Sequence, residues 1–178
     1  VQFITREQEK RKRLRLVEKL GDVHETLDTW VISDAVQKIL VRYPSLEAQI
    51  FPAIIVDMKN ERHDSYWVLN FPNRLDCWDR EASEVSEEED LEYGCSASVS
   101  LYAFNSKALE AVPLESRLVF QMGHVEEPLV FAHRSIVSEM KEAGVKGCIF
   151  IPAADYREGC EMGSSERLDR NNIAYIEL

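Results

Sequence analysis

Two stretches of the chain, 31–53 and 131–153, repeat one succession of strand, amphipathic helix and strand at an offset of 100 residues. At this offset the matched residues are Val36 and Ile136, Leu40 and Met140, and Pro52-Ala53 and Pro152-Ala153. Since an amphipathic helix must bury its apolar face against another element, the pattern predicts an α+β fold. We expect two similar strand–helix–strand halves, over 31–71 and 118–153, packed around a mixed or antiparallel sheet. The identities are few, so chance similarity between two such units is the alternative.

The chain before this repeat predicts a separate helix. Over residues 6–20, apolar side chains recur at three-residue steps among helix-forming residues, and Gly21 stands where a C-terminal cap would. A length of 178 residues fits a single domain. The sequence therefore predicts a basic N-terminal helix over 1–21, followed by a single α+β domain over 22–178.

Charge is distributed unevenly along the chain. Residues 1–20 hold seven basic and three acidic side chains, a net charge of +4, whereas the other 158 residues hold 14 and 29, a net charge of −15. Such an acidic body repels nucleic-acid phosphate, so we expect no nucleic-acid partner. A basic protein partner fits the charge, and acidity that serves only solubility is the alternative.

The sequence also bears on where the protein resides. No apolar run approaches the about 18–20 residues of a membrane helix, so no membrane partner is expected. The chain opens at Val1 without a charged-then-apolar leader, and its four cysteines form no Cys-x-x-Cys pair. These features are typical of a cytoplasmic protein with free thiols rather than disulfides or a metal site.

Further elements are predicted from local patterns. Ser33-Asp34 is expected to cap the first helix through a side-chain oxygen, and Pro44 to stop it. Six acids lie within the nine residues from Glu84 to Glu92, so we expect a mobile loop there rather than a core element. The other expected elements are strands at 50–56, 65–71, 75–79, 96–103, 117–121, 129–131, 147–153 and 173–178, and helices at 106–111 and 133–143.

No sequence motif for catalysis or cofactor binding is present. The chain lacks G-x-G-x-x-G, a Lys-bearing phosphate loop and G-x-S-x-G. In Asp76-Cys77-Trp78-Asp79 a thiol stands beside two carboxylates, which raise the thiol pKa and so disfavour a nucleophile. Asp76 and Asp79 could serve as a carboxylate pair, but no third partner is fixed in the sequence. We therefore expect no catalytic residues, no metal and no cofactor, and a binding protein rather than an enzyme.

Several motifs, taken in order, resemble a known family. The first half contributes Val31-Ile32-Ser33-Asp34 before a helix, Tyr66-Trp67-Val68-Leu69-Asn70, Asp76-Cys77 and Asp79. The second half contributes Leu118-Val119-Phe120-Gln121, Val130-Phe131 before a helix, and the helix ending Gly144-Val145-Lys146-Gly147-Cys148-Ile149-Phe150-Ile151-Pro152. Together they resemble the immunity protein 11 family of bacterial competition systems over residues 27–155, with the basic N-terminal helix outside the match.

One segment departs from that family. Where the family often has Val-Ser-(Asp/Glu) before its second helix, this chain has Ala132-His133-Arg134. His133 is expected to cap this helix or to lie at the surface, and the cap is otherwise Ser135 or absent.

The resemblance implies a cytoplasmic protein that binds and neutralises one cognate antibacterial effector toxin of a secretion system. We expect an acidic surface to dock on a basic surface of the toxin and to block its active site sterically and electrostatically. Trp78 and Tyr93 are the expected aromatic anchors. The expected partner-binding residues are Asp76, Trp78, Asp79, Glu81, Glu84, Glu87, Glu88, Glu89, Asp90, Glu92 and Tyr93.

Other functions stay open at the level of the sequence. An enzyme could use Asp76 and Asp79 to reverse or counteract a toxin's modification. An acidic regulatory protein-interaction module could use its basic N-terminal helix on a membrane or nucleic acid. The acidic run could also be a solubilising loop without a partner.

Overall fold

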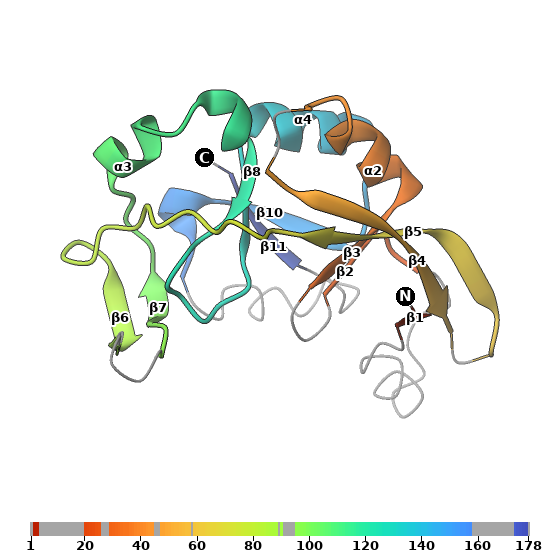
Figure 1. Cartoon of the computed structure of the whole chain (residues 1–178), viewed down its shortest axis with the longest axis horizontal. Coiled ribbons are helices and arrows are strands. Elements are labelled where there is room, and N and C mark those ends of the chain that lie inside the picture. Colours follow the sequence, from red (N-terminus) through yellow and green to blue (C-terminus); the bar gives the residue numbers. More distant parts are fainter. Residues whose placement is uncertain are drawn as a thin grey trace.

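The structure is a computed structural model that describes residues 2–3, 20–25, 29–44, 47–57, 59–88, 90, 95–157 and 173–177. The described residues form a five-stranded, a four-stranded and a two-stranded sheet with three α-helices (Figure 1). Most neighbouring strands are antiparallel, and the α+β class is confirmed. The basic helix expected at the N-terminus falls almost wholly on 4–19, outside the described residues.

The first half of the chain builds the five-stranded sheet, in the order β1-β4-β5-β3-β2. Its elements are β1 (Gln2–Phe3), β2 (Val23–Glu25), β3 (Trp30–Ser33), α2 (Asp34–Leu40), β4 (Gln49–Val56) and β5 (Arg62–Asn70). β1 runs parallel to β4, and the other neighbours are antiparallel. The strands expected at 50–56 and 65–71 are thus present, and the second begins three residues earlier than expected.

The second half builds the four-stranded sheet, in the order β10-β11-β9-β8. Its elements are β8 (Val119–Gln121), β9 (Val130–Ala132), α4 (Arg134–Glu142), β10 (Cys148–Pro152) and β11 (Ile173–Glu177). His133 caps α4, because its Nδ1 accepts a hydrogen bond from the Ser135 amide at 3.3 Å. Gly144 follows the helix with a φ of 69°, as a glycine cap requires.

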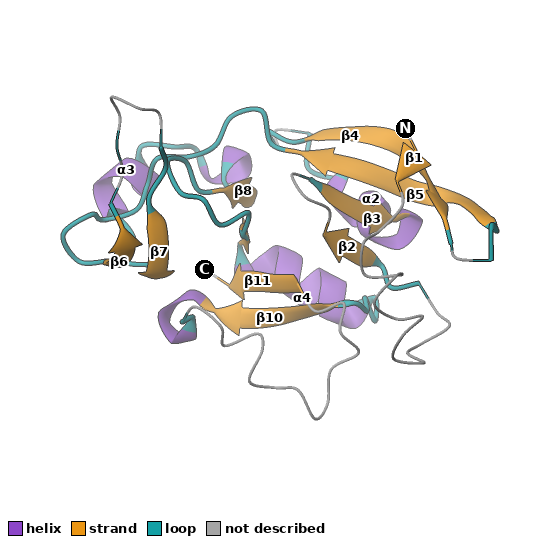
Figure 2. Cartoon of the chain, turned by 90° about the horizontal axis from the view of Figure 1, so that it is seen from below, coloured by secondary structure: helices purple, strands orange, loops and turns teal. Residues whose placement is uncertain are grey.

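The two longer helices lie side by side and cover the same side of the two large sheets (Figures 1 and 2). Their buried side chains share one core cluster, and each belongs to a helix face that the sequence predicts to be apolar: Val36, Ile39, Leu40, Ile136, Val137 and Met140. Trp30 of β3 joins this cluster, and its Nε1 donates to the Pro128 carbonyl at 3.0 Å. None of the described helices is long and apolar enough to cross a bilayer.

The two large sheets share a strand order, which is β4-β5-β3-β2 in one and β10-β11-β9-β8 in the other. They differ in the direction of one strand, because β5 runs antiparallel to β3 whereas its counterpart β11 runs parallel to β9. A tight turn over 57–61 reverses the chain between β4 and β5, while the long connection 153–172 permits parallel neighbours in the second sheet. The internal duplication therefore stays a prediction.

The remaining elements sit at one end of the molecule (Figure 1). They are β6 (Glu84–Glu87), β7 (Ser98–Leu101), α3 (Ser106–Glu110) and two 3₁₀ turns, η1 (Leu114–Ser116) and η2 (Ala153–Asp155). Val99 of β7 is buried in a second core cluster together with Phe120 and Phe131. The short helix expected at 106–111 is confirmed, and Asn105 caps it by accepting from the Ala108 amide at 3.1 Å.

The prediction of a mobile loop over 84–92 is wrong for the first half of this segment. Residues 84–87 form β6, which pairs antiparallel with β7. Val85 packs against the second core cluster, whereas Glu84 and Glu87 are exposed. Glu84 and Val85 point to opposite faces because neighbouring residues of a strand alternate, so the apolar side chain can pack inward while Glu84 stays in water. The pairing with β7 shifts its register between Val85 and Glu87.

The side-chain cap expected at the start of α2 is also wrong. Ser33 occupies the N-cap position, but its hydroxyl donates to Asp22 Oδ1 at 2.7 Å. Asp34 accepts from the indole Nε1 of Trp67 at 2.6 Å. Both oxygens therefore serve tertiary partners, which compete with the local cap for the same atoms.

A clasp of backbone contacts joins the segment before β2 to the turn after α4. The Asp22 amide donates to the Lys146 carbonyl at 2.7 Å, and the Lys146 amide donates to Asp22 Oδ2 at 2.8 Å. A Cβ on Gly147 would stand 3.1 Å from Gly21 Cα and from the Val23 carbonyl oxygen. Glycine is therefore required for the two segments to approach this closely.

Candidate partner-binding surface

The segment before β6 is irregular, but it is attached to the core at two points. Leu75 forms an isolated parallel bridge with Met122, and Trp78 forms an isolated antiparallel bridge with Phe104. The strand expected at 75–79 is thus reduced to single bridges. These bridges hold the segment between two parts of the chain that are distant in sequence.

Cys77 and Trp78 lie beneath the surface of this segment. Cys77 Sγ donates to Met122 Sδ at 3.5 Å. Burial, with the Asp76 charge adding to it, raises the pKa of Cys77 to about 12. A thiol that stays protonated is a poor nucleophile, in agreement with the interpretation of the sequence. Trp78 is only 3 % exposed, so it supports the surface from below.

We expect Cys77 to resist alkylation at about pH 8 in the folded protein, whereas the exposed Cys95 reacts. The folded state holds the Cys77 proton more tightly than the unfolded chain does. Cys77 therefore favours folding below its ordinary pKa of 9.0, and this contribution is lost as the pH rises toward about 12. Mass spectrometry after iodoacetamide treatment measures both thiols, and equal labelling would contradict the expectation. The Cys77→Ala variant is the control, and it should lose less stability over that alkaline range.

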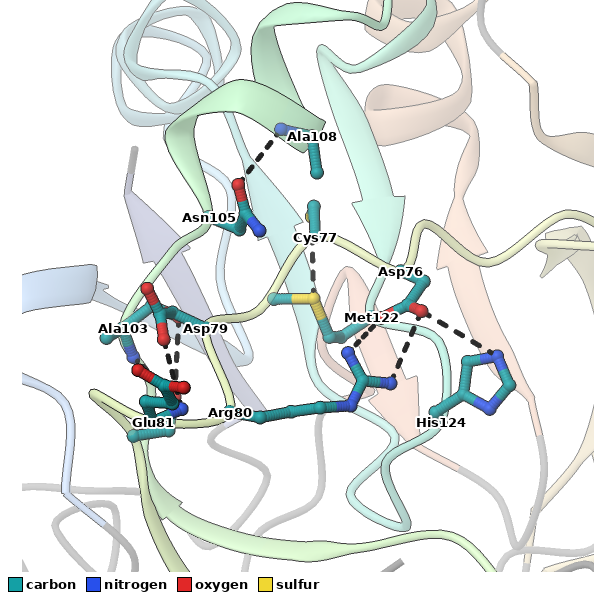
Figure 3. A network of polar contacts seen from close by, with 11 residues as sticks. Asp76, Cys77, Asp79, Arg80, Glu81, Ala103, Asn105, Ala108, Met122 and His124 are labelled. Atoms are coloured by element: carbon teal, nitrogen blue, oxygen red, sulfur yellow. Dashed lines mark hydrogen bonds and ion pairs between the residues drawn. The ribbon is translucent and has the colours of Figure 1, made fainter. Parts of the chain in front are cut away.

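Asp76 is exposed, but its carboxylate has partners (Figure 3). Arg80 Nη1 and Nη2 donate to its two oxygens at 2.9 and 3.3 Å, and His124 Nε2 lies 4.0 Å from Oδ2. The guanidinium carbon of Arg80 also lies 4.5 Å from the centroid of the Trp78 ring. Arg80 was not among the candidates from the sequence, and the ion pair largely offsets the charge of Asp76.

Asp79 shapes the turn that leads into β6. Its Oδ1 accepts from the amides of Glu81 and Ala82 at 3.0 and 3.1 Å, and its own amide donates to the Ala103 carbonyl at 2.8 Å. Figure 3 shows Asp76 and Asp79 turned toward different partners. The structure therefore does not bring these two carboxylates together as a catalytic pair.

The other acidic candidates follow on the turn and the β6–β7 hairpin. Those with exposed residues are Glu81, Glu84, Glu87, Glu88 and Asp90. None of the four glutamates forms an ion pair with another described residue. Asp90 pairs through its backbone with Cys95. The candidates that lie outside the described residues are Glu89, Glu92 and Tyr93.

Sequence reasoning missed a half-buried carboxylate that supports this hairpin. Glu127 Oε1 accepts from Ser98 Oγ at 2.8 Å and from the Val99 amide at 3.1 Å, and Oε2 accepts from the Tyr102 hydroxyl at 2.9 Å. These bonds fix β7 to the segment before β9. A lone glutamate carries no local signal of this task, because its partners lie 25 to 29 residues earlier in the chain.

A second polar group stands at the turn between β4 and β5. Asp57, Glu61 and His63 place atoms able to ligate a metal within 4.8 Å of one another. Asp57 accepts from the amides of Lys59 and Glu61 at 2.8 and 2.9 Å and contacts His63 Nε2 at 3.3 Å. Burial alone would raise the pKa of Asp57, but these bonds together hold that pKa below its ordinary value. The hydrogen bonds of a hairpin turn account for the grouping.

These features place the chain among α+β proteins that carry an exposed acidic surface on a packed support. The model of the immunity protein family (Imm11) matches residues 5–155. The chain belongs to this immunity protein family, and the resemblance seen in the sequence is confirmed. Because the match begins at residue 5, most of the basic N-terminal segment lies inside it, contrary to expectation. A search of curated proteins found no match.

Proposed function

We propose that this protein binds one cognate toxin and neutralises it as a stoichiometric inhibitor rather than as an enzyme. Family membership gives it a role in toxin immunity. The observation that carries the binding mode is the set of exposed glutamates at positions 81, 84, 87 and 88, which the turn and β6 present together and which form no ion pair within the described part of the chain. Asp76 and Asp79 are each engaged by other groups, which favours binding over catalysis.

An acidic surface selects a partner with a basic one. Complementary charge raises association rates by about 10–1000-fold at low salt, which suits an inhibitor that must capture a toxin before damage occurs. Because Arg80 offsets the charge of Asp76, the attractive field comes mainly from the glutamates of the turn and of β6. The encounter takes place in the cytoplasm of the protected cell.

The support beneath the acids favours a steric block of the toxin's active site. Glu127 and the buried Val99 hold the hairpin on the core. A surface that is already ordered loses less conformational entropy on binding than a disordered loop does. The paired strands β6 and β7 can therefore cover a cleft without first having to fold.

Replacing Glu84, Glu87 and Glu88 together by glutamine is expected to weaken toxin binding by roughly tenfold at low salt, because several long-range attractions are removed while the strand is kept. The loss should shrink as salt is added, since screening removes the same attractions from the parent protein. Surface plasmon resonance at several salt concentrations, with the toxin encoded beside this chain, measures both effects. The association rate should carry most of the change.

The matched control replaces three exposed glutamates elsewhere, Glu61, Glu115 and Glu142, by glutamine. It changes the net charge equally and should alter affinity far less. Equal losses in both variants, or unchanged affinity and salt dependence in the first, would remove the hairpin from the mechanism. A titration of toxin activity distinguishes inhibitor from enzyme, because a stoichiometric inhibitor ends the activity at one equivalent, whereas protection at substoichiometric amounts indicates turnover.

A further inference from the structure

Arg80 occupies a site that has the chemistry of an arginine receptor (Figure 3). On one side the Asp76 carboxylate accepts from both terminal nitrogens of the guanidinium at 2.9 and 3.3 Å. The Trp78 ring lies 4.5 Å from the guanidinium carbon. A carboxylate that binds in a fork and an aromatic face together select a planar guanidinium over a lysine ammonium.

The core holds the Trp78 ring and the backbone beside Asp76 in place independently of Arg80. Trp78 is buried and paired with Phe104, and the carbonyl of Cys77 accepts from the Asn105 amide at 2.8 Å. Asp76 directly precedes the anchored residues Cys77 and Trp78 in the sequence. The site should therefore keep its shape when its occupant leaves, as a preorganised binding site does.

The occupant itself is displaceable. Arg80 lies on the turn that Asp79 forms, outside any helix, and its side chain is 44 % exposed. A solvent-exposed ion pair of this kind contributes little to stability, because water and salt weaken the attraction. An external arginine can thus compete with Arg80 for Asp76, especially when the glutamates nearby attract it.

We propose that Asp76 and the Trp78 ring form a binding site for an arginine side chain of the partner, which Arg80 fills in the free protein. The incoming guanidinium takes over the fork to Asp76 and the face of Trp78, while Arg80 swings into solvent. That the partner is the toxin rests on the proposed function. The site itself stands on the contacts of this chain.

The first test uses the chain alone, with L-arginine amide as probe and L-lysine amide as comparison. The reporter is the NMR signal of the Trp78 indole N–H, which a Trp78→Phe variant assigns. This indole nitrogen is buried without an acceptor among the described residues, whereas Trp30 and Trp67 donate hydrogen bonds, so its signal should be distinct. The Arg80→Ala variant should bind arginine amide about fivefold more tightly than the parent does, and more tightly than it binds lysine amide.

Two variants serve as controls. Arg74→Ala removes an exposed arginine from the same segment and should leave probe binding at the parent level. Asp76→Asn in the Arg80→Ala background should abolish the preference for arginine. The proposed site would be overturned if the Arg80→Ala protein, shown to be folded by its NMR spectrum, bound both probes equally or bound neither. The contact of Arg80 with Asp76 would then be an ordinary surface ion pair.

The second test measures toxin affinity of the Arg80→Ala variant. The affinity should rise several-fold, because an internal competitor is removed, and it should exceed that of Arg74→Ala. Selective binding of arginine amide with no gain in toxin affinity would overturn the toxin as the source of the arginine. The acidic hairpin would still be judged by its own glutamine variants, so the failure of one proposal is distinguishable from the failure of the other.

Discussion

Replacing Phe131 by alanine is expected to lower the free energy of unfolding by about 3–5 kcal/mol. Phe131 of β9 is fully buried, and its ring stacks on Phe120 with centroids 5.4 Å apart. Tyr102 and Phe104 approach it edge-on, also at 5.4 Å. Alanine would lose these ring contacts and leave a cavity that the surrounding strands cannot close. The cost therefore combines the lost free energy of burying the ring with the penalty for the cavity.

Urea unfolding at neutral pH measures this loss, and Phe51→Ala is the matched control. Phe51 is 47 % exposed on β4, so its removal should cost about 1 kcal/mol or less. Because Phe104 pairs with Trp78, the Phe131 variant should also loosen the partner-binding surface before it unfolds the whole chain. Similar costs for the two phenylalanines would contradict the assignment of the second core cluster.

Replacing Gly147 by alanine is expected to cost about 3 kcal/mol, because two penalties coincide there. Its φ of 89° is unfavourable for any residue with a Cβ. That Cβ would also stand 3.1 Å from Gly21 Cα and from the Val23 carbonyl oxygen, which are backbone atoms and cannot turn aside. The clasp between the segment before β2 and the turn after α4 would have to open.

Gly144→Ala separates these two penalties. Gly144 has a φ of 69°, but a Cβ there would meet no atom within 4 Å. Its substitution should therefore cost only the backbone strain, about 1 kcal/mol. Midpoints of urea unfolding at constant slope give both values. A Gly147 variant as stable as the Gly144 variant would show that the clasp tolerates a wider separation.

The helices were predictable because their signals are local. The apolar faces of α2 and α4 and the glycine after α4 are encoded at short spacing, and the structure has all of them. The acidic run was misjudged for a related reason. Its charge density predicted a loop, but one partly buried side chain, Val85, together with pairing to β7, is enough to make a strand of residues 84–87.

The cap of α2 shows where local reasoning fails. Ser33 is the kind of residue that caps a helix, and it stands at the expected position. Its hydroxyl nevertheless donates to Asp22, and Asp34 accepts from Trp67. Nothing within a turn of the helix indicates either partner, because both are brought there by the pairing of β2, β3 and β5.

The sequence by itself determined the class of fold, the periodicity of the helices, the acidity of the body and, through its ordered motifs, the family. Only the tertiary structure decided which of the described acids are exposed and which are engaged by other described residues. It pairs Asp76 with Arg80, uses Asp79 and Glu127 to hold backbone, and leaves the β6 glutamates in solvent. The physical reason is that hydrophobicity and helix capping act over a few residues, whereas a carboxylate's partners depend on which distant segments the core brings within hydrogen-bonding distance.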